Sequence, residues 1–243
     1  MNIPADPSPV TPTSAALCAV AMASETATAT GRSRTNLALH HLFAACRFSA
    51  QIQRVELENA GATFGEFWEE ILQYSLGVAT LSVASLESYA NEHLADGALS
   101  TGTIQPKALE SLALLIDREP IVNKFNLVLE LRTGHTLDFG ANVVQNVDLL
   151  IKLRNAVVHF RPEWDGEQGA HVKLSSKLQN RFYRSPYFAN EGLFPRAWAT
   201  RSFSAWALKS AIDFLEHFGQ ESGLDSKLAP FRARFSHFSN GAV

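Results

Sequence analysis

The segment 64–96 carries apolar residues on two opposite faces of a helix, and this pattern limits the possible folds more than any other feature of the chain. One face has Phe67, Ile71, Tyr74, Val78 and Leu81, and the other has Leu72, Leu76, Ala79, Val83, Ala90 and Leu94. A helix that is apolar on two sides must be covered on both sides. The segment therefore predicts the central helix of a bundle.

Helical spacing of apolar residues continues through most of the remaining chain, and strand signals are too few for a sheet. The other predicted helices span 35–59, 106–117, 120–132, 141–160, 202–219 and 226–236. Pro162 has to end the helix 141–160. The stretch 163–200 after it is predicted to be an irregular basic and aromatic insertion, with a short strand pair around His171–Leu178. We therefore expect an all-α helical bundle.

Composition divides the chain into two parts and limits its chemistry. Residues 1–32 are rich in Pro, Ala, Thr and Ser, which predicts a disordered tail before a helical domain over 33–243. Hydrophobic residues make up 46% of the 243 residues, enough for a core, and no apolar run is long enough to span a membrane. The cysteines, Cys18 and Cys46, form no disulfide or zinc pattern, so we expect a soluble, cytoplasmic protein without metal or cofactor.

The formal net charge of −3 hides an uneven distribution along the chain. Residues 1–139 contain 8 basic and 15 acidic side chains, whereas residues 140–243 contain 13 basic and 9 acidic ones. Residues 152–201 alone contain 9 basic and 4 acidic side chains. A basic C-terminal half on an acidic protein indicates a local anionic ligand rather than general binding of polyanions.

Two charged residues fall within predicted apolar helix faces. A helical wheel places Arg154 in the middle of the apolar face of 141–160, and Glu87 within the second apolar face of 64–96. Because an isolated buried charge is costly, the two residues are predicted to meet as a buried ion pair. Such a pair either only fixes the register of the two helices, or orients the Arg154 guanidinium towards a phosphate.

The residues Arg154-Asn155-Ala156-Val157-Val158-His159 resemble the signature of the HEPN domain family, which has Arg, a polar residue and then His. The segment Ser85–Glu92, with Glu87 and Asn91, resembles an earlier helix of that family, so the resemblance covers about residues 64–160. It implies a helical, metal-independent ribonuclease whose site is completed across a homodimer. Arg154, Asn155, His159 and Glu87 are the catalytic residues that it implies.

The chemistry implied by this resemblance is attack of a ribose 2′-OH on the neighbouring phosphate, which leaves a 2′,3′-cyclic phosphate and a 5′-OH end. His159 would transfer protons near neutral pH, and Arg154 would stabilise charge on the phosphoryl oxygens. Asn155 would orient the phosphate or the histidine. Arg154 and His159 are five residues apart, so on an ideal helix they point about 140° apart, a difficulty that a second protomer would relax.

Basic and aromatic side chains alternate between Lys173 and Phe203, which is typical of contacts with unpaired RNA. The predicted RNA-binding residues are Lys152, Arg161, Arg181, Tyr183 and Arg184. The alternative is that the aromatic residues belong to the core and the cations form a solvated face. The remaining histidines, His171 among them, have no partner at a recognisable spacing.

The leading interpretation is a dimeric, metal-independent endoribonuclease that acts as a toxin or defence effector. RNA and a second copy of the chain are its expected partners, together with a possible antitoxin or regulatory protein. One alternative is a non-catalytic HEPN-like module that binds RNA or protein. Another is a purely structural helical dimer.

Overall fold

The computed structural model describes residues 35–95, 108, 111, 114–164, 169–224 and 228. In this part of the chain every regular element is helical and no strand occurs, which confirms the predicted all-α bundle. The predicted tail 1–32, almost all of the predicted helix 226–236 and half of the predicted helix 106–117 lie outside the described residues. None of the described helices is long and apolar enough to cross a membrane.

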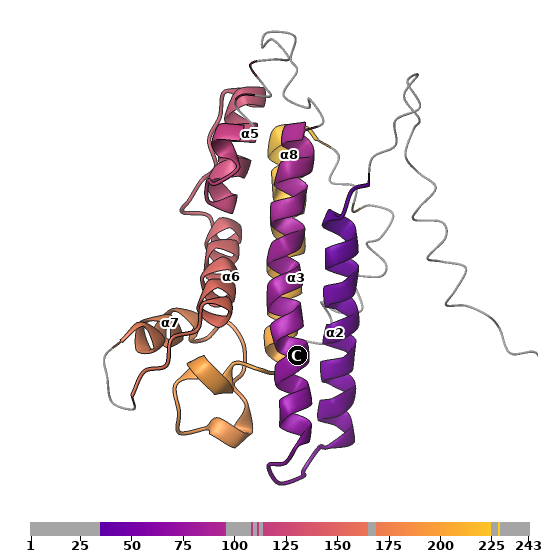
Figure 1. Cartoon of the computed structure of the whole chain (residues 1–243), viewed down its shortest axis with the longest axis vertical. Coiled ribbons are helices and arrows are strands. Elements are labelled where there is room, and N and C mark those ends of the chain that lie inside the picture. The colour runs from indigo at the N-terminus through magenta and orange to yellow at the C-terminus, as the bar shows by residue number, and fades with distance from the viewer. Residues whose placement is uncertain are drawn as a thin grey trace, which may run out of the picture. The chain divides into compact units, whose positions relative to one another are not determined.

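The elements follow one another as four long and several shorter helices (Figure 1). They are α2 (Ala38–Glu58), α3 (Phe67–Ala95), α5 (Ile121–Thr133), α6 (Asn142–Val158), α7 (Ala170–Leu178), η1 (Pro186–Phe188), η2 (Leu193–Ala197) and α8 (Arg201–Ser222). The predicted helices 35–59, 64–96, 120–132, 141–160 and 202–219 are therefore confirmed to within a few residues at each end.

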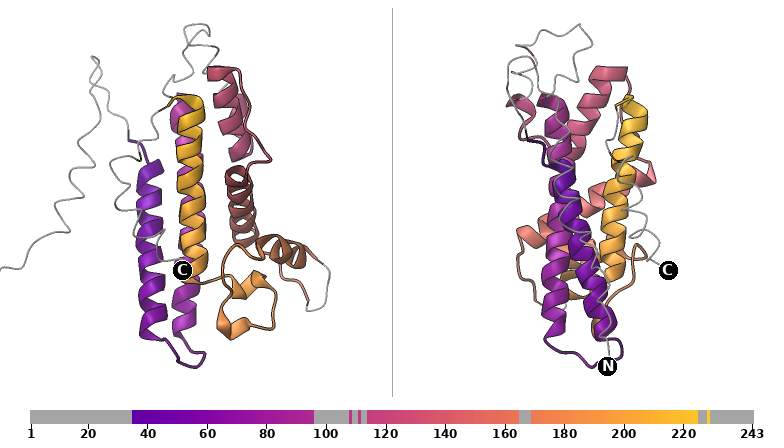
Figure 2. Two further views of the ribbon diagram at one scale, coloured as in Figure 1. Left: turned by 180° about the vertical axis from the view of Figure 1, so that it is seen from behind. Right: turned by 90° about the vertical axis from the view of Figure 1, so that its right-hand side faces the viewer.

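Helix α3 is the central helix, as its two apolar faces predict. It packs against α2, α5, α6 and α8. In Figure 1, α2 lies on one side of α3, with α5 and α6 on the other, and α8 lies behind α3. The turned view in Figure 2 separates α8 from α3. Residues from both faces of α3, such as Ile71, Val78 and Val83, are buried in the common core.

An aromatic cluster joins α3, α5 and α8 in that core. The Phe125 side chain is fully buried, and its ring centroid lies 4.8 Å from those of Phe214 and Phe218, both in edge-on geometry. The ring of Tyr89 of α3 stacks on Phe125 at a centroid distance of 6.1 Å. Such edge-on aromatic pairs stabilise a core beyond the effect of buried area alone.

Two long helices begin at carboxylates supplied by other helices. Glu92 of α3 accepts the backbone N–H groups of Leu37 and Ala38 at the start of α2, at 2.8 and 2.9 Å. Glu56 of α2 accepts the N–H of Arg201 at the start of α8, at 2.8 Å. A negative charge at a helix N-terminus satisfies unpaired N–H groups and complements the helix dipole. These contacts therefore fix the relative positions of α2, α3 and α8.

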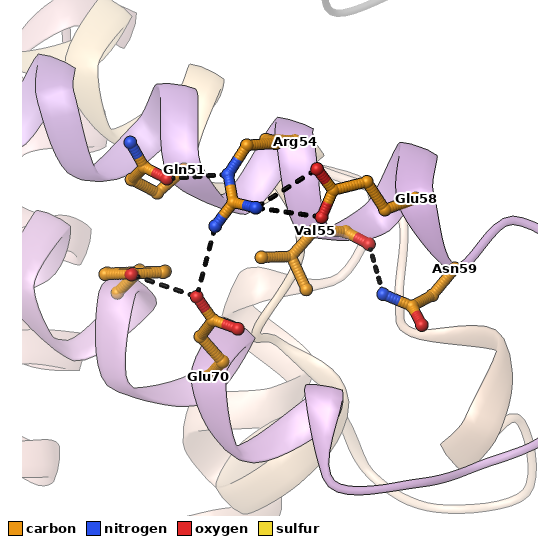
Figure 3. Close-up of polar contacts among 7 residues, drawn as sticks. Gln51, Arg54, Val55, Glu58, Asn59 and Glu70 are labelled. Atoms are coloured by element: carbon orange, nitrogen blue, oxygen red, sulfur yellow. Dashed lines mark hydrogen bonds and ion pairs between the residues drawn. The ribbon is translucent and has the colours of Figure 1, made fainter.

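The hairpin between α2 and α3 has close packing and a polar network. Gly77 of α3 lets the two helices pack closely, because a Cβ at this position would lie 2.4 Å from the ring of Phe48 on α2. Near the turn, Arg54 donates to Glu58 at 2.8 Å and to Glu70 of α3 at 3.3 Å (Figure 3). Glu70 also accepts from the Tyr74 hydroxyl at 3.0 Å, and this hydrogen bond raises the pKa of Tyr74.

The predicted strand pair around His171–Leu178 is wrong, because Ala170–Leu178 forms helix α7. Leu174 and Leu178, four residues apart, are both buried, so the apolar spacing there is helical. The N-terminus of α7 is bound by Glu163, a residue from outside the helix. The carboxylate that accepts the first N–H groups of α7 thus lies seven and eight residues before them in the sequence.

Candidate functional site

Helices α3 and α6 bring Glu87 and Arg154 together. An Nη2 atom of Arg154 lies 3.9 Å from Oε2 of Glu87, and 21% of the Arg154 side chain is exposed. This distance is that of an ion pair and is too long for a hydrogen bond. The Nε–H of Arg154 is buried and has no hydrogen-bond partner among the described residues. Arg154 thus has donors that its carboxylate neighbour does not occupy.

The prediction that this pair is fully buried is wrong for Glu87, whose side chain is 44% exposed. The buried side of α3 at this level runs through Val83, Leu86 and Ala90, and Glu87 lies at its edge. On α6 the fully buried residues include Leu150 and Leu153 rather than the half-exposed Val158. The buried residues of α6 end at Leu153, so Arg154, which follows it, is only partly buried.

Asn155 and His159 lie on the exposed side of α6, one turn apart. His159 is the C-cap residue of the helix, and its backbone N–H donates to the carbonyl of Asn155 at 2.9 Å. Among the described residues, no hydrogen bond or ion pair joins the His159 imidazole to Arg154 or Glu87. Within one chain the predicted catalytic residues thus form two separate pairs, Glu87 with Arg154 and Asn155 beside His159.

Lys152 and Arg161, predicted to bind RNA, are both exposed near this end of α6. Lys152 forms an ion pair with Asp148, one turn earlier on the same helix. Arg161 follows the helix and lines neither of the two pockets described next. Lys152 and Arg161 therefore lie outside both pockets, although the neighbours of Arg161, Phe160 and Pro162, line the first one.

An open pocket of about 730 Å³, here called the aromatic cleft, begins directly after His159. Its aromatic wall consists of Phe160, His171 and Phe194, with Phe160 and His171 stacked at 5.3 Å and Phe194 edge-on to His171 at 4.8 Å. Trp164 also lines the cleft, and 84% of it is exposed. The cleft is lined by the segment that follows α6, by residues of α7 and η2, and by the chain just before η2.

Glu163 anchors α7 at this cleft. Its carboxylate accepts the N–H groups of His171 and Ala170, at 3.1 and 2.7 Å, and these backbone hydrogen bonds lower the pKa of Glu163. Nδ1 of His171 lies 3.7 Å from the same carboxylate. Gly169, just before α7, leaves the space for Glu163, because a Cβ there would lie 2.3 Å from Oε2. The aromatic wall is thus held in place by the α7 cap.

A second pocket of about 580 Å³, here called the basic pocket, contains three of the predicted RNA-binding residues. Arg181, Tyr183 and Arg184 line it together with Lys209 of α8, and no carboxylate is among its lining residues. The Tyr183 side chain is 76% exposed, whereas Phe182 beside it is buried. The alternative that aromatic residues of this segment belong to the core does not hold for Tyr183, but it is correct for the buried residues Phe182, Phe188, Phe194, Trp198 and Phe203.

Arg184 lines both pockets and makes them neighbours. The two pockets together are here called the groove. The sequence did not identify four further residues of this groove, which are Trp164, His171 with its neighbour Glu163, and Lys209. Glu163 and His171 are separated by a connection rather than by helical spacing, so no periodicity relates them. Lys209 is brought to the basic pocket only by the packing of α8. The exposed aromatic Trp164 was the one available signal.

The fold and these pockets define an all-α bundle with a groove at the C-terminal end of α6. No protein-family model matches the sequence, and comparisons with curated proteins and with solved structures found no significant match. Among the described residues, no three His, Cys, Asp or Glu side chains cluster as metal ligands would. The resemblance to the HEPN family therefore rests on the residues of α3 and α6 alone.

Proposed function

We propose that this protein is a metal-independent, HEPN-like endoribonuclease that acts as a toxin or defence effector. The observation that carries the proposal is the position of the groove. Phe160, the residue after His159, forms a wall of the aromatic cleft, and the cleft shares Arg184 with a pocket lined by cations and no carboxylate. An RNA strand in this groove would pass the end of α6 that bears Asn155 and His159.

The proposed reaction breaks the bond between phosphorus and the 5′ oxygen. The ribose 2′-OH loses its proton to a base, attacks the adjacent phosphorus, and forms the 2′,3′-cyclic phosphate. The leaving 5′ oxygen takes a proton and becomes a 5′-OH. His159 is the suitable group for these proton transfers. The Arg154 guanidinium, held beside Glu87 with unoccupied donors, would stabilise charge on the phosphoryl oxygens.

A homodimer is part of the proposal because one chain keeps Arg154 and His159 on different sides of α6. Val158 and Phe160 flank His159, and each is about half exposed. Burial of the Val158 side chain against a second copy would stabilise an interface and bring two motifs together, and Phe160 would stay in the wall of the cleft. We also propose a cytoplasmic location, which the cysteine content predicts.

A second candidate function is an RNA-binding module without catalysis. The absence of any described contact between His159 and Arg154 favours it, because the motif alone then has no assembled site. In this case the groove would bind RNA and the ion pair would only fix the register of α3 and α6. The two candidates differ in whether RNA is cleaved after it is bound.

The test is incubation of the full chain with unstructured RNA in EDTA. Wild type should cleave, and both His159→Ala and Arg154→Ala should lose most of the activity. Removal of a general acid or base typically costs about 100-fold to 10,000-fold in rate. His135→Ala is the matched control, because this histidine is exposed in the connection between α5 and α6. Binding by wild type without cleavage supports the non-catalytic candidate instead.

A further inference from the structure

The two pockets share three wall residues, Gln179, Leu193 and Arg184, and the charged one, Arg184, is held by two hydrogen bonds. Nη1 of Arg184 donates to the backbone carbonyls of Ala189 and Glu191, at 2.9 and 3.0 Å. Nε and Nη2 have no hydrogen bond among the described residues, so one edge of the guanidinium is available. A guanidinium fixed in advance loses little side-chain entropy when it binds a ligand, and its planar donors match a phosphate.

The aromatic cleft on one side of Arg184 offers flat, exposed surfaces without free negative charge. Trp164 is almost fully exposed, and Phe160 is about half exposed. Of the two carboxylates in the lining, Glu163 is occupied by backbone N–H groups. Glu191 is bound by Arg196 through two hydrogen bonds, at 2.6 and 3.0 Å. The cleft therefore suits a flat heterocycle that carries a nearby phosphate.

The basic pocket on the other side of Arg184 combines positive charge with one exposed ring. Arg181, Arg184 and Lys209 are its charged lining residues, and Lys209 is paired with Asp213 at 2.8 Å. The Tyr183 side chain is free on the surface, because its hydrogen bonds to Ser202 and Thr200 involve only the backbone. An exposed tyrosine among cations is a platform on which a base can stack.

We infer that the groove binds two consecutive unpaired nucleotides, with Arg184 on the phosphate between them. One base stacks against Trp164 and Phe160 in the aromatic cleft, and the other stacks on Tyr183 in the basic pocket. The inference rests on the proposed function in taking RNA as the ligand, but it requires binding only and no cleavage. A docked protein helix is disfavoured because it needs a continuous apolar stripe, whereas cations interrupt the apolar surface at Arg184.

The test is fluorescence anisotropy of a labelled single-stranded hexaribonucleotide with the full chain carrying His159→Ala, which keeps the RNA intact. In this background Arg184→Ala should raise Kd at least about tenfold, and Trp164→Ala and Tyr183→Ala at least about fivefold each. Arg184→Ala should also reduce the slope of log Kd against log salt by about 0.7, the value for one lost phosphate contact on a single strand. Arg184→Lys should restore part of the affinity.

The matched controls are Arg118→Ala and Phe139→Ala, an exposed cation and an exposed aromatic residue outside both pockets. Both should bind as the parent does. An RNA duplex should compete at least tenfold more weakly than the single strand, and a deoxyribose single strand shows whether the 2′-OH contributes. Tyr183→Ala keeps the test decisive if Arg184→Ala fails to fold, because the Tyr183 ring has no described structural contact.

The outcomes separate this inference from the proposed function. Unchanged binding in Arg184→Ala, Trp164→Ala and Tyr183→Ala overturns the inference, even where wild type cleaves RNA. Equal competition by a duplex, or no oligonucleotide binding at all, overturns it as well, and the latter would favour a protein occupant. Groove-dependent binding without cleavage by wild type supports the inference and contradicts the proposed ribonuclease.

Discussion

Removal of Glu87 and Arg154, singly and together, tests whether the carboxylate holds the guanidinium. Charges about 4 Å apart attract by roughly 1 kcal/mol in water and roughly 4 kcal/mol at an effective dielectric constant of 20. Since the Glu87 side chain is 44% exposed and no hydrogen bond is formed, solvent screening keeps the interaction near the lower limit. The expected coupling energy in the folded state is therefore about 1 kcal/mol.

The assay is urea denaturation of wild type, Glu87→Gln, Arg154→Gln and the double variant, which together form a double-mutant cycle. The exposed pair Lys152–Asp148 on α6 provides a matched cycle, for which about 0.3–0.5 kcal/mol is expected. Both couplings should shrink at high salt. If the losses in free energy of unfolding for Glu87→Gln and Arg154→Gln are additive, with no coupling beyond error, then Glu87 does not position Arg154.

Three further predictions concern the cap, the core and the interface. Backbone hydrogen bonds lower the pKa of Glu163 in the folded protein. Its carboxylate therefore stabilises the fold above the ordinary pKa of about 4.5, and this stabilisation is lost as the pH falls through the lower pKa of the folded state. In urea unfolding between pH 3 and 6, the free energy of unfolding of Glu163→Gln should therefore depend less on pH than that of wild type. Phe125→Ala should cost about 3–5 kcal/mol of unfolding free energy, whereas exposed Phe139→Ala should change it little. Val158→Asp should shift a dimer to monomer in light scattering while the circular dichroism spectrum is unchanged; a monomeric wild type would contradict the proposed dimer.

The helical framework was predictable because burial imposes the helical period directly on the sequence. The two apolar faces of 64–96 identified α3 as the central helix, and Pro162 correctly marked the end of α6. The wrong predictions concern segments whose structure is set by contacts between residues far apart in the sequence. The strand pair predicted around His171–Leu178 is wrong although Leu174 and Leu178 have helical spacing, and the contact of Glu163 with the start of α7 is one that no local pattern indicates.

The candidate site was predictable in part for the same reason. A charged residue in an apolar face needs a partner, and this argument correctly paired Glu87 with Arg154. The wheel does not show where burial ends along α3 and α6, so it placed both side chains too deep. The basic and aromatic composition of the insertion led to Arg181, Tyr183 and Arg184, but their arrangement around one groove depends on the folded insertion and on α8.

His159 and Arg154 are proposed to act together on RNA, and the ends of the reaction products distinguish this chemistry from other kinds of RNA cleavage. Mass spectrometry of a short RNA incubated with wild type in EDTA should detect fragments that end in a 2′,3′-cyclic phosphate, paired with fragments that begin with 5′-OH. Neither set should accumulate with His159→Ala or Arg154→Ala. Intact RNA after incubation with wild type, or the same fragments from both variants, would contradict the account.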